Sequence, residues 1–516
     1  MNKRLLTLAM ALFIVGAAFS KTIYVNDNAT GNNDGTSWED AYTNFSEAIE
    51  SAQSGDELWV AAGIYYPTSQ PNYPVGSSDP KFNHFTLKNG VKILGGFAGD
   101  ETSIAQRDLT ANKSVLSGDI DKNDDVEGEG YVSDYTKVNG KNSLKLFYFP
   151  EGSTIDTTAV LDGFVLTAAV AGNDVSPYNS GAAFYCKGAS PKIVNCDFYG
   201  NYAKYYAGAI FLDNSSMVLE NCNFEGNKAE AHAGAFYYEN SEVSLRNCDF
   251  INNRARYGGA LSASNNESVS EFENCTFENN SAWNNAGVLT TVTSPNVFKN
   301  CSFINNEAPW GGALVLYTES SSEIINCIFE GNRTVPSAHP DVGEHGGAIY
   351  AAYKSKVNIY NSAFRGNEAY VNGGAIFSLD TADIKAYNTL FTGNVNGETM
   401  ATSSSGSAIY SDSSKVTLVN STIASNYSYH NYSDQYGAAV NNRGADLIIR
   451  NCIIWENHGK YQIRSANGVE DVTNSNVQGG FTGSGNMDVI PLFLDPVTTS
   501  STPSTGGNYR LWGNSP

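Results

Sequence analysis

A short phrase of amino acids returns along most of this chain at almost constant intervals. In its commonest form it reads N-C-x-F-x-x-N, and its copies begin at Asn195, Asn221, Asn247, Asn274, Asn300, Asn326, Asn361, Asn388, Asn420 and Asn451. The first five steps measure 26, 26, 27, 26 and 26 residues. A period in this range indicates a solenoid, in which each unit buries its apolar side chains against the neighbouring units.

The local pattern inside each unit predicts strands rather than helices. Apolar residues alternate with polar ones before each Asn, as in Val243 and Leu245, and Cys248 and Phe250 continue the buried set after it. A G-G-A-[IL] corner, as at Gly258, then precedes a third apolar strand. Leucine-rich repeats would need a leucine framework, and helical solenoids would need a 3.6-residue period. The sequence therefore predicts an all-β parallel β-helix with three short strands per rung.

The repeat also resembles a known family. The G-G-A-[ILV] corner and the F-x-x-N phrase, as in Phe198, Phe224 and Phe303, are similar to the polymorphic outer-membrane protein repeat of bacterial surface β-helices. The likeness covers roughly residues 160 to 460. It implies a right-handed, single-stranded parallel β-helix of the pectin-lyase-like fold, displayed at the cell surface or outer membrane. Some members of that family are adhesins or autotransporter passengers.

The C-terminal residues carry a second resemblance. The stretch from Pro491 to Pro496, followed by Asn508 to Leu511, is similar to the C-terminal segment of secreted β-helix proteins with variable surface anchors. In those proteins the chain continues past this segment. The resemblance thus implies surface attachment through an anchor beyond Pro516 or through a partner.

The domain organisation follows from these patterns. Lys3, Arg4 and an apolar run before Lys21 predict a secretory signal peptide over residues 1–20, cleaved near Ser20. Residues 21–60 should form a strand and an amphipathic capping helix between Ser37 and Ser54, which would cover the open end of the β-helix. Irregular rungs with long loops are expected over 61–160, regular rungs over 161–480, and the C-terminal segment over 481–516. We expect an exported bacterial protein.

Charge restricts the partners. The chain carries a net charge of −22, whereas binding to nucleic acid or to an anionic membrane requires clustered Lys and Arg. Nucleic-acid binding is therefore excluded from the expected functions. The expected partners are a polysaccharide or a cell-surface protein.

Two repeated columns are interpreted as structural ladders. We expect the first Asn of each phrase to point inward and to bond to the backbone and to the next rung (Asn195, Asn221, Asn247, Asn274, Asn300 and Asn326). The cysteine that follows should be a small buried filler (Cys196, Cys222, Cys248, Cys275, Cys301 and Cys327). Disulfides remain an alternative in an exported protein, whereas a linear stack does not suit tetrahedral zinc.

One acidic run suggests calcium. Asp119, Asp121, Asn123 and Asp125 place oxygen ligands at alternate positions, as in calcium-binding loops. Because position six is Asp124 rather than Gly and position twelve is Gly130 rather than Glu, the run does not fit an EF-hand. An irregular Ca²⁺ loop and a solvated loop remain the two alternatives.

The corner after the second Asn of the phrase provides the candidate ligand-binding residues. Three rungs carry insertions there, over residues 333–345, 395–405 and 427–436. Loops on one face are where solenoids usually bind. The candidates are Tyr206, Tyr257, Trp283, Trp310, His339, His345, Tyr370, Tyr429, His430 and Tyr432. They either form an outward aromatic stripe that stacks on sugars or on a partner, or a ladder in which the aromatics stack only on one another.

Two classes of function remain open. A polysaccharide lyase or glycoside hydrolase of this fold would need a catalytic cluster, such as paired carboxylates across a groove. The outward positions of the repeat show no such cluster, so no catalytic residue is assigned. The sequence thus favours a binding, adhesion or structural rod, with the enzyme as the alternative.

Overall fold

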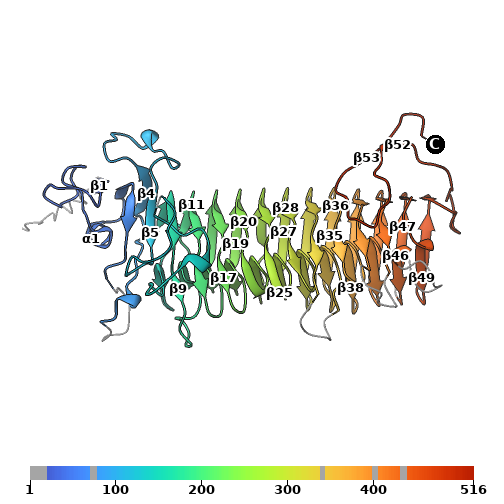
Figure 1. Ribbon diagram of the computed structural model, residues 1–516, viewed down its shortest axis with the longest axis horizontal. Helices are drawn as coiled ribbons and strands as arrows, with labels where there is room; N and C mark the ends of the chain where they lie inside the picture. Colours follow the sequence, from blue (N-terminus) through green and yellow to red (C-terminus); the bar gives the residue numbers. More distant parts are fainter. Residues whose placement is uncertain are drawn as a thin grey trace, which may run out of the picture.

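The computed structural model describes residues 20–69, 78–128, 130–336, 343–397, 405–429, 438–444 and 446–515. The chain forms a long rod in which successive rungs stack from one end to the other (Figure 1). Four long parallel sheets run the length of the rod. The protein is a right-handed parallel β-helix. The predicted signal peptide and the loop residues His339, His430 and Tyr432 lie outside the described residues.

The first sheet has fifteen strands, and the second has fourteen. The first contains β1 (Thr22–Val25), β2 (Glu57–Ala61), β4 (Lys92–Phe97), β7 (Val160–Asp162), β11 (Lys192–Val194), β15 (Ser216–Glu220), β19 (Glu242–Arg246), β23 (Ser270–Glu273), β27 (Pro295–Lys299), β31 (Ser321–Ile325), β35 (Lys356–Tyr360), β39 (Asp383–Tyr387), β43 (Lys415–Val419), β47 (Leu447–Arg450) and β50 (Glu470–Thr473). The second contains β3 (Gly63–Tyr65), β5 (Ser114–Ser117), β8 (Phe164–Thr167), β12 (Asp197–Tyr199), β16 (Asn223–Glu225), β20 (Asp249–Ile251), β24 (Thr276–Glu278), β28 (Ser302–Ile304), β32 (Ile328–Glu330), β36 (Ala363–Arg365), β40 (Leu390–Thr392), β44 (Thr422–Ala424), β48 (Ile453–Trp455) and β51 (Asn476–Val477).

The third sheet has ten strands, most of them only two residues long, and the fourth has twelve. The third contains β9 (Val170–Ala171), β13 (Tyr202–Ala203), β17 (Lys228–Ala229), β21 (Arg254–Tyr257), β25 (Ser281–Asn285), β29 (Glu307–Ala308), β33 (Arg333–Thr334), β37 (Glu368–Ala369), β41 (Val395–Asn396) and β45 (Tyr427–Ser428). The fourth contains β6 (Phe147–Phe149), β10 (Phe184–Lys187), β14 (Ile210–Asp213), β18 (Phe236–Glu239), β22 (Leu261–Ser264), β26 (Leu289–Val292), β30 (Leu314–Tyr317), β34 (Ile349–Ala351), β38 (Ile376–Leu379), β42 (Ile409–Asp412), β46 (Ala438–Arg443) and β49 (Tyr461–Ala466).

A regular rung therefore has four strands, and the expectation of three was wrong. The missed strand is the short one that follows the second Asn of the phrase, such as β17. Two residues give no visible alternation in a sequence, so periodicity could not reveal them. This third sheet carries the outward side chains that matter for the candidate site.

The interior is filled by columns of identical side chains. The Phe of each F-x-x-N phrase stacks on the Phe of the next rung, with ring centroids 4.3–5.2 Å apart (Phe198, Phe224, Phe250, Phe277, Phe303, Phe329, Phe364 and Phe391). All eight are fully buried. Burial of one such side chain stabilises a fold by roughly 1.5–3 kcal/mol, which explains why the phrase returns with so little change.

The polar ladder inside the rod is made by the second Asn of the phrase, not by the first. These residues are fully buried (Asn201, Asn227, Asn253, Asn280, Asn306, Asn332, Asn367, Asn394 and Asn426). Asn280 illustrates the pattern: its Oδ1 accepts from the backbone and side-chain nitrogens of Asn253, each at 3.0 Å. Its Nδ2 donates to the carbonyl of Phe250 at 2.7 Å and to Oδ1 of Asn306 at 3.0 Å. The ladder thus satisfies the backbone groups that a buried corner would leave unpaired.

The first Asn of each phrase also forms a ladder, but on the outside. Asn195, Asn221, Asn247, Asn274, Asn300 and Asn326 adopt φ values of 50–55°, and five of them are exposed while Asn195 is half-buried. Their side chains bond from rung to rung at 3.0–3.2 Å. The inward orientation predicted from parity was wrong, because the left-handed backbone conformation at this bend turns the side chain outward. Asn is one of the few residues that adopts this conformation readily.

The cysteine column lies inside the rod. Cys196, Cys222, Cys248, Cys275, Cys301 and Cys327 are buried, and all are free thiols. Each Sγ faces backbone carbonyls, as Cys248 faces the carbonyl of Arg246 at 3.3 Å. The cysteines thus act as small buried side chains that fill the interior between the first two sheets.

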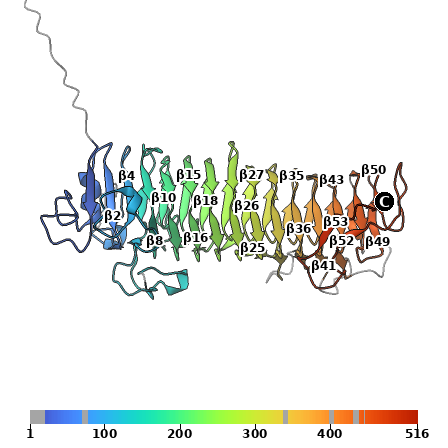
Figure 2. The same ribbon diagram turned by 90° about the horizontal axis from the view of Figure 1, so that it is seen from above.

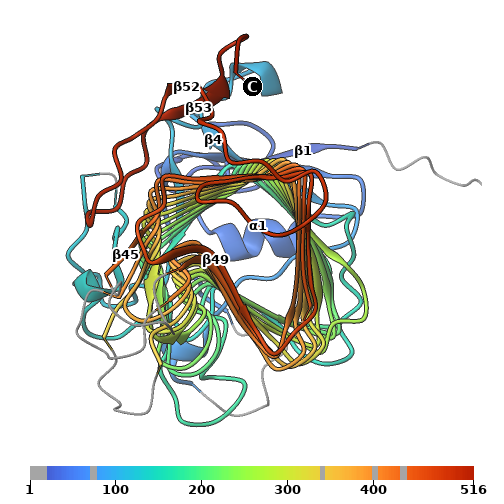
Figure 3. The same ribbon diagram turned by 90° about the vertical axis from the view of Figure 1, so that its right-hand side faces the viewer.

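The N-terminal end of the bore is closed by one short helix, α1 (Phe45–Ser51). The end-on view shows this helix across the bore (Figure 3). Asn44 caps it by accepting from the backbone of Ser46 and Glu47, and Phe45, Ala48 and Ile49 are buried. The predicted helix from Ser37 to Ser54 was too long. Residues 37–44 form turns instead, and Trp38 packs on Tyr24 with ring centroids 4.8 Å apart.

The other helical elements are three short 3₁₀ turns, namely η1 (Pro80–Phe82), η2 (Ile104–Gln106) and η3 (Tyr135–Lys137). No helix within the described ranges is long and apolar enough to span a membrane.

Two segments outside the rungs lie along the rod on the same side, with β25 between them (Figure 2). The first is the insertion that contains η3, where the backbone nitrogen of Tyr135 donates to the carbonyl of Gly226 at 3.1 Å. The second is the C-terminal segment, which contains the antiparallel pair β52 (Phe493–Asp495) and β53 (Asn508–Leu511). Its Ser504 donates to the carbonyl of Gly393 at 3.1 Å.

Candidate binding groove

A groove of about 850 Å³ lies over the third sheet, beside the insertion that contains η3. Its floor comes from outward side chains of β17, β21, β25 and β29. At one end stands Tyr135 of the insertion, and at the other stand Val335 and Pro336. The long axis of the groove crosses the rungs, so it runs along the rod.

The strand period explains which side chains face the groove. In β21, Ala255 is fully buried, so Arg254 and Arg256 on either side of it point outward. In β25, Ala282 is buried and Ser281 and Trp283 point outward. Two residues apart on one strand corresponds to about 7 Å. Each of these strands therefore presents two side chains to a bound molecule.

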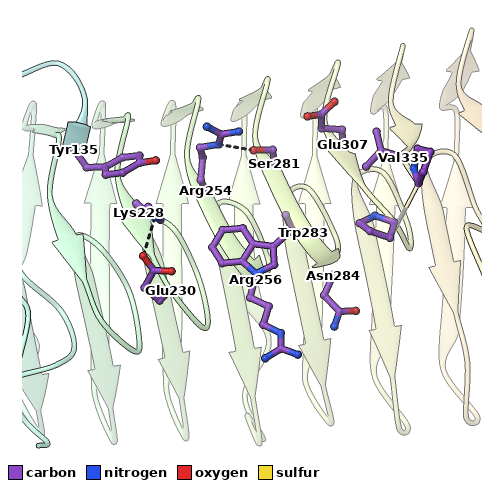
Figure 4. A pocket seen from close by; sticks show the side chains of 13 residues that line it. Tyr135, Lys228, Glu230, Arg254, Arg256, Ser281, Trp283, Asn284, Glu307 and Val335 are labelled. Atoms are coloured by element: carbon purple, nitrogen blue, oxygen red, sulfur yellow. Dashed lines mark hydrogen bonds and ion pairs between the residues drawn. The ribbon is translucent and has the colours of Figure 1, made fainter. Parts of the chain in front are cut away.

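A β-bulge separates β25 from β21. Ala255 pairs with Ala282, but Tyr257 pairs with Asn285, so Trp283 and Asn284 lie opposite the single residue Arg256. Bulges re-aim side chains and are frequent beside functional sites. Trp283 is the most prominent side chain on this bulge, because 46% of its surface is exposed. Figure 4 shows its ring between the side chains of Arg254 and Arg256.

The cations around the tryptophan differ in their partners. Lys228 forms an ion pair of 2.8 Å with Glu230, and its Nζ lies over the rings of Tyr135 and Trp283 at 4.8 and 5.9 Å. Arg254 donates from Nε to Oγ of Ser281 at 3.1 Å. The guanidinium of Arg256 lies over the ring of Tyr257 at 5.2 Å. Among the described residues, neither arginine has a carboxylate within 4.0 Å.

Both carboxylates that line the groove are already engaged. Glu230 binds Lys228 and accepts from the hydroxyl of Tyr202 at 3.3 Å. Glu307 forms an ion pair of 2.8 Å with Arg333. Burial, with the charge of Glu230 as a lesser cause, raises the pKa of Tyr202 to about 12. The available charge in the groove is therefore cationic.

The predicted aromatic stripe divides into two groups. Tyr206, His232 and Tyr257 follow one another on successive rungs by single bridges, but the next bridge joins Asn285, not Trp283, to Trp310. Trp310 is half-buried against Tyr350, with ring centroids 4.7 Å apart. The prediction assigned Trp283 and Trp310 to one stripe because both follow the second Asn of the phrase at the same corner, whereas Trp310 pairs with Asn285 and Trp283 lies on the bulge.

Most of the remaining candidates contact other aromatic rings. Tyr206 packs on Tyr237 at 4.4 Å between ring centroids. His345 stacks on Phe377 at 4.3 Å, and burial lowers the pKa of its imidazole to about 4.

Two tyrosines of the predicted edge are held by specific hydrogen bonds. The hydroxyl of Tyr429 donates to the carbonyl of Ser501 at 3.2 Å, and the backbone of Tyr370 bonds to Thr334. Both side chains are half-buried. Trp283 is therefore the described member of the predicted edge that is exposed and faces the groove. Its cationic neighbours Lys228, Arg254 and Arg256 were not predicted as site residues, because the short strands of the third sheet show no period in the sequence.

The acidic run forms a closed turn rather than an open ligand set. Asp119 accepts from the backbone nitrogens of Asn123 and Asp124, each at 3.1 Å. Asp121 accepts from the backbone nitrogen of Lys141 at 3.1 Å. The part of the chain that the structure describes contains no group of three or more His, Cys, Asp or Glu side chains arranged to hold a metal ion. Asp119 and Asp121 thus accept hydrogen bonds from backbone amides, and the Ca²⁺ set of Asp119, Asp121, Asn123 and Asp125 stays a prediction.

Burial, opposed by hydrogen bonds from Asn139 and Asn142, raises the pKa of Asp124 in that turn to about 6. This carboxyl is buried, as is Asp119. Asp119 and Asp124 therefore do not belong to a solvated loop. Their hydrogen bonds instead hold the insertion that forms one wall of the groove.

Comparison with known proteins agrees with the fold. A family model described as a right-handed β-helix region matches residues 165–290 and 230–410. Comparison with curated proteins finds no match. Solved structures with a similar fold include the pectate lyase Pel9A, at 12% identity over 97% of this chain and 91% of that one, with a TM-score of 0.26. They also include a rhamnogalacturonan lyase, at 12% identity over 78% and 87%, with a TM-score of 0.26. The surface protein and adhesin PfbA of Streptococcus pneumoniae is 13% identical over 86% and 95%, with a TM-score of 0.27.

Proposed function

We propose that this protein is an exported, surface-held rod that binds a glycan in the groove over its third sheet. The observation that carries the proposal is the Trp283 ring, exposed on a β-bulge in the middle of an elongated groove. An exposed ring flanked by polar donors is the usual platform for a sugar, because the apolar face of the sugar stacks on it while its hydroxyls bond to neighbours.

Binding is a better assignment than catalysis for this groove. Glu230 and Glu307 are each held by a cation, so neither is set up as one of the two carboxylates that a glycoside hydrolase needs. Export and surface display, implied by the N-terminal residues and by the repeat family, complete the proposal.

The proposal is tested with a pair of tryptophan variants. Trp283→Ala should reduce retention on immobilised glycans at least tenfold while changing the melting temperature little, because the ring is exposed. Trp310→Ala should leave retention unchanged and lower the free energy of unfolding by about 2–3 kcal/mol, because its ring packs on Tyr350. Affinity electrophoresis and thermal melts measure both.

The opposite pattern, with glycan binding lost only in the Trp310 variant, would remove the groove from the proposal. The same glycans are also incubated with the wild-type protein and examined for new reducing ends and unsaturated products. Appearance of such products would make the protein an enzyme of this fold.

A further inference from the structure

Arg254 and Arg256 are two neighbouring cations that have no carboxylate partner within the described parts of a chain rich in carboxylates. Several other arginines of the rod form ion pairs, such as Arg107 with Asp162 at 3.1 Å and Arg333 with Glu307 at 2.8 Å. Both groove arginines are exposed and lie on the same face of β21. A guanidinium binds carboxylate and sulfate groups with two parallel hydrogen bonds, which gives it geometric selectivity for them.

The field of these arginines is not cancelled by the acids of the groove. Glu230 and Glu307 are neutralised by Lys228 and Arg333, respectively. The side of the groove formed by Arg254, Arg256 and Trp283 therefore attracts an anion locally, although the net charge of the whole chain is −22. At physiological ionic strength, charges more than about 8 Å away are screened. The charged groups in contact with the ligand therefore determine the local electrostatic potential.

The imidazole next to Arg256 adds no charge at neutral pH. His232 stacks on Tyr257 with ring centroids 4.8 Å apart, and burial, with a smaller contribution from Arg256, lowers its pKa to about 4. Besides the two guanidiniums, the charged side chains that line the groove and the adjoining hollow are Lys228, Glu230, Glu307, Asp134 and Glu225. No described histidine lines either hollow, so affinity should change little between pH 6 and pH 8.

We propose that the groove binds an acidic polysaccharide, with a sugar ring on Trp283 and a carboxylate or sulfate group held by Arg254 and Arg256. This inference rests on the proposed glycan-binding function and specifies its substrate class. A polymer is favoured over a small ligand because the groove is elongated and crosses several rungs, from Tyr135 to Pro336. A second, smaller hollow of about 440 Å³ shares Arg254, Ser281 and Glu307 with it, so the surface continues around the corner of the rod.

The test measures retention of the full chain on three polymers of similar length: a polyuronate, a sulfated galactan and a neutral galactan. The first two distinguish carboxylate from sulfate as the anion. Arg254→Gln and Arg256→Gln should each weaken binding to the preferred acidic polymer by about tenfold, the effect of losing one charge-assisted hydrogen bond. Arg246→Gln is the matched control, because this substitution removes the same charge. Arg246 lies on the first sheet, away from the groove.

The outcomes separate the two proposals. Equal binding of all three polymers, lost in Trp283→Ala but unchanged in the arginine variants, would overturn the acidic class and leave the glycan function intact. Equal weakening by Arg246→Gln would also overturn it, because binding would then depend only on overall charge. No retention of any polymer by the wild-type protein would overturn both proposals.

Discussion

At the scale of single residues, the repeat is held by amides in two different environments. The exposed ladder of first Asn residues uses the left-handed backbone at each bend, whereas the buried ladder of second Asn residues bonds to backbone groups inside the rod. The two columns look alike in the sequence, six residues apart. Removal of a second Asn leaves buried backbone groups without hydrogen-bond partners, whereas removal of a first Asn does not.

Replacement of one buried Asn should therefore be costly. Asn280→Ala removes the acceptor of two hydrogen bonds and the donor of two more, and we expect a loss of about 2–4 kcal/mol in the free energy of unfolding. Asn274→Gly, which keeps the left-handed backbone and removes only an exposed amide contact, should cost less than about 1 kcal/mol. Denaturant titration of both variants measures the difference, and equal losses would show that the inner ladder has no special role.

His232 should make stability depend on pH. Its pKa in the folded chain is about 4, against 6.5 for the free side chain, so the unfolded chain binds more protons between these values. The stabilising contribution is complete above pH 6.5 and is lost as the pH falls toward 4. His232→Phe keeps a ring on Tyr257 but cannot titrate, so its melting temperature should fall less than that of the wild type over this range. An identical fall in both proteins would contradict the assignment.

At the scale of elements, strands with several alternating residues could be predicted from the sequence, and short ones could not. The first and second strands of each rung were found from their period, as in β19 and β20. Most strands of the third sheet have only two residues and show no period, and β21, with four residues, contains a single buried residue between two outward ones. The outward side chains of this sheet, including Arg254, were therefore not predicted to form a site. The bulge of β25 is likewise invisible in one sequence, because it appears only in the pairing with β21.

Candidate site residues were predicted in the right region but in the wrong grouping. Trp283 was found because an aromatic residue stands out beside polar neighbours. Tyr206, Tyr257 and Trp310 were assigned to the same stripe, but they pack on aromatic rings of neighbouring strands. Whether each of these aromatic side chains is exposed depends on contacts between the third and fourth sheets. A local sequence pattern does not reveal such contacts.

At the scale of the whole molecule, the residue just before the second Asn of each phrase lies at the corner where two other segments cross the rod. Gly200 and Gly226 contact the insertion, and Gly366 and Gly393 contact the C-terminal segment. The three middle rungs of the groove have Asn at this corner instead (Asn252, Asn279 and Asn305). All of these residues have a positive φ, which both Gly and Asn tolerate. Glycine thus allows the closest approach of a crossing segment, although the C-terminal segment also bonds to Ser425 and Glu456 at the same corner.

Exchange at one corner should release the C-terminal segment. A Cβ at Gly393 would lie 2.0 Å from the carbonyl oxygen of Ser504, whereas one at Gly331 would meet only the flexible side chain of Asn305. Gly393→Asn should therefore make residues 496–507 at least tenfold more sensitive to protease, and Gly331→Asn should not. Limited proteolysis with mass spectrometry detects this, and both rods should melt within about 5 °C of the wild type. Unchanged cleavage of Gly393→Asn would show that the contact does not hold the segment.

The C-terminal segment also has a mechanical consequence. Hydrogen bonds between rungs are directed along the rod, so tension along the rod acts directly on every interface between rungs. The terminal rung is bonded on one side only and should separate first. The segment bonds to successive rungs through Glu456, Ser425, Gly393 and Arg365. Force applied to this end is therefore shared among several interfaces, and a load carried from a ligand in the groove would be resisted by the rungs as a group.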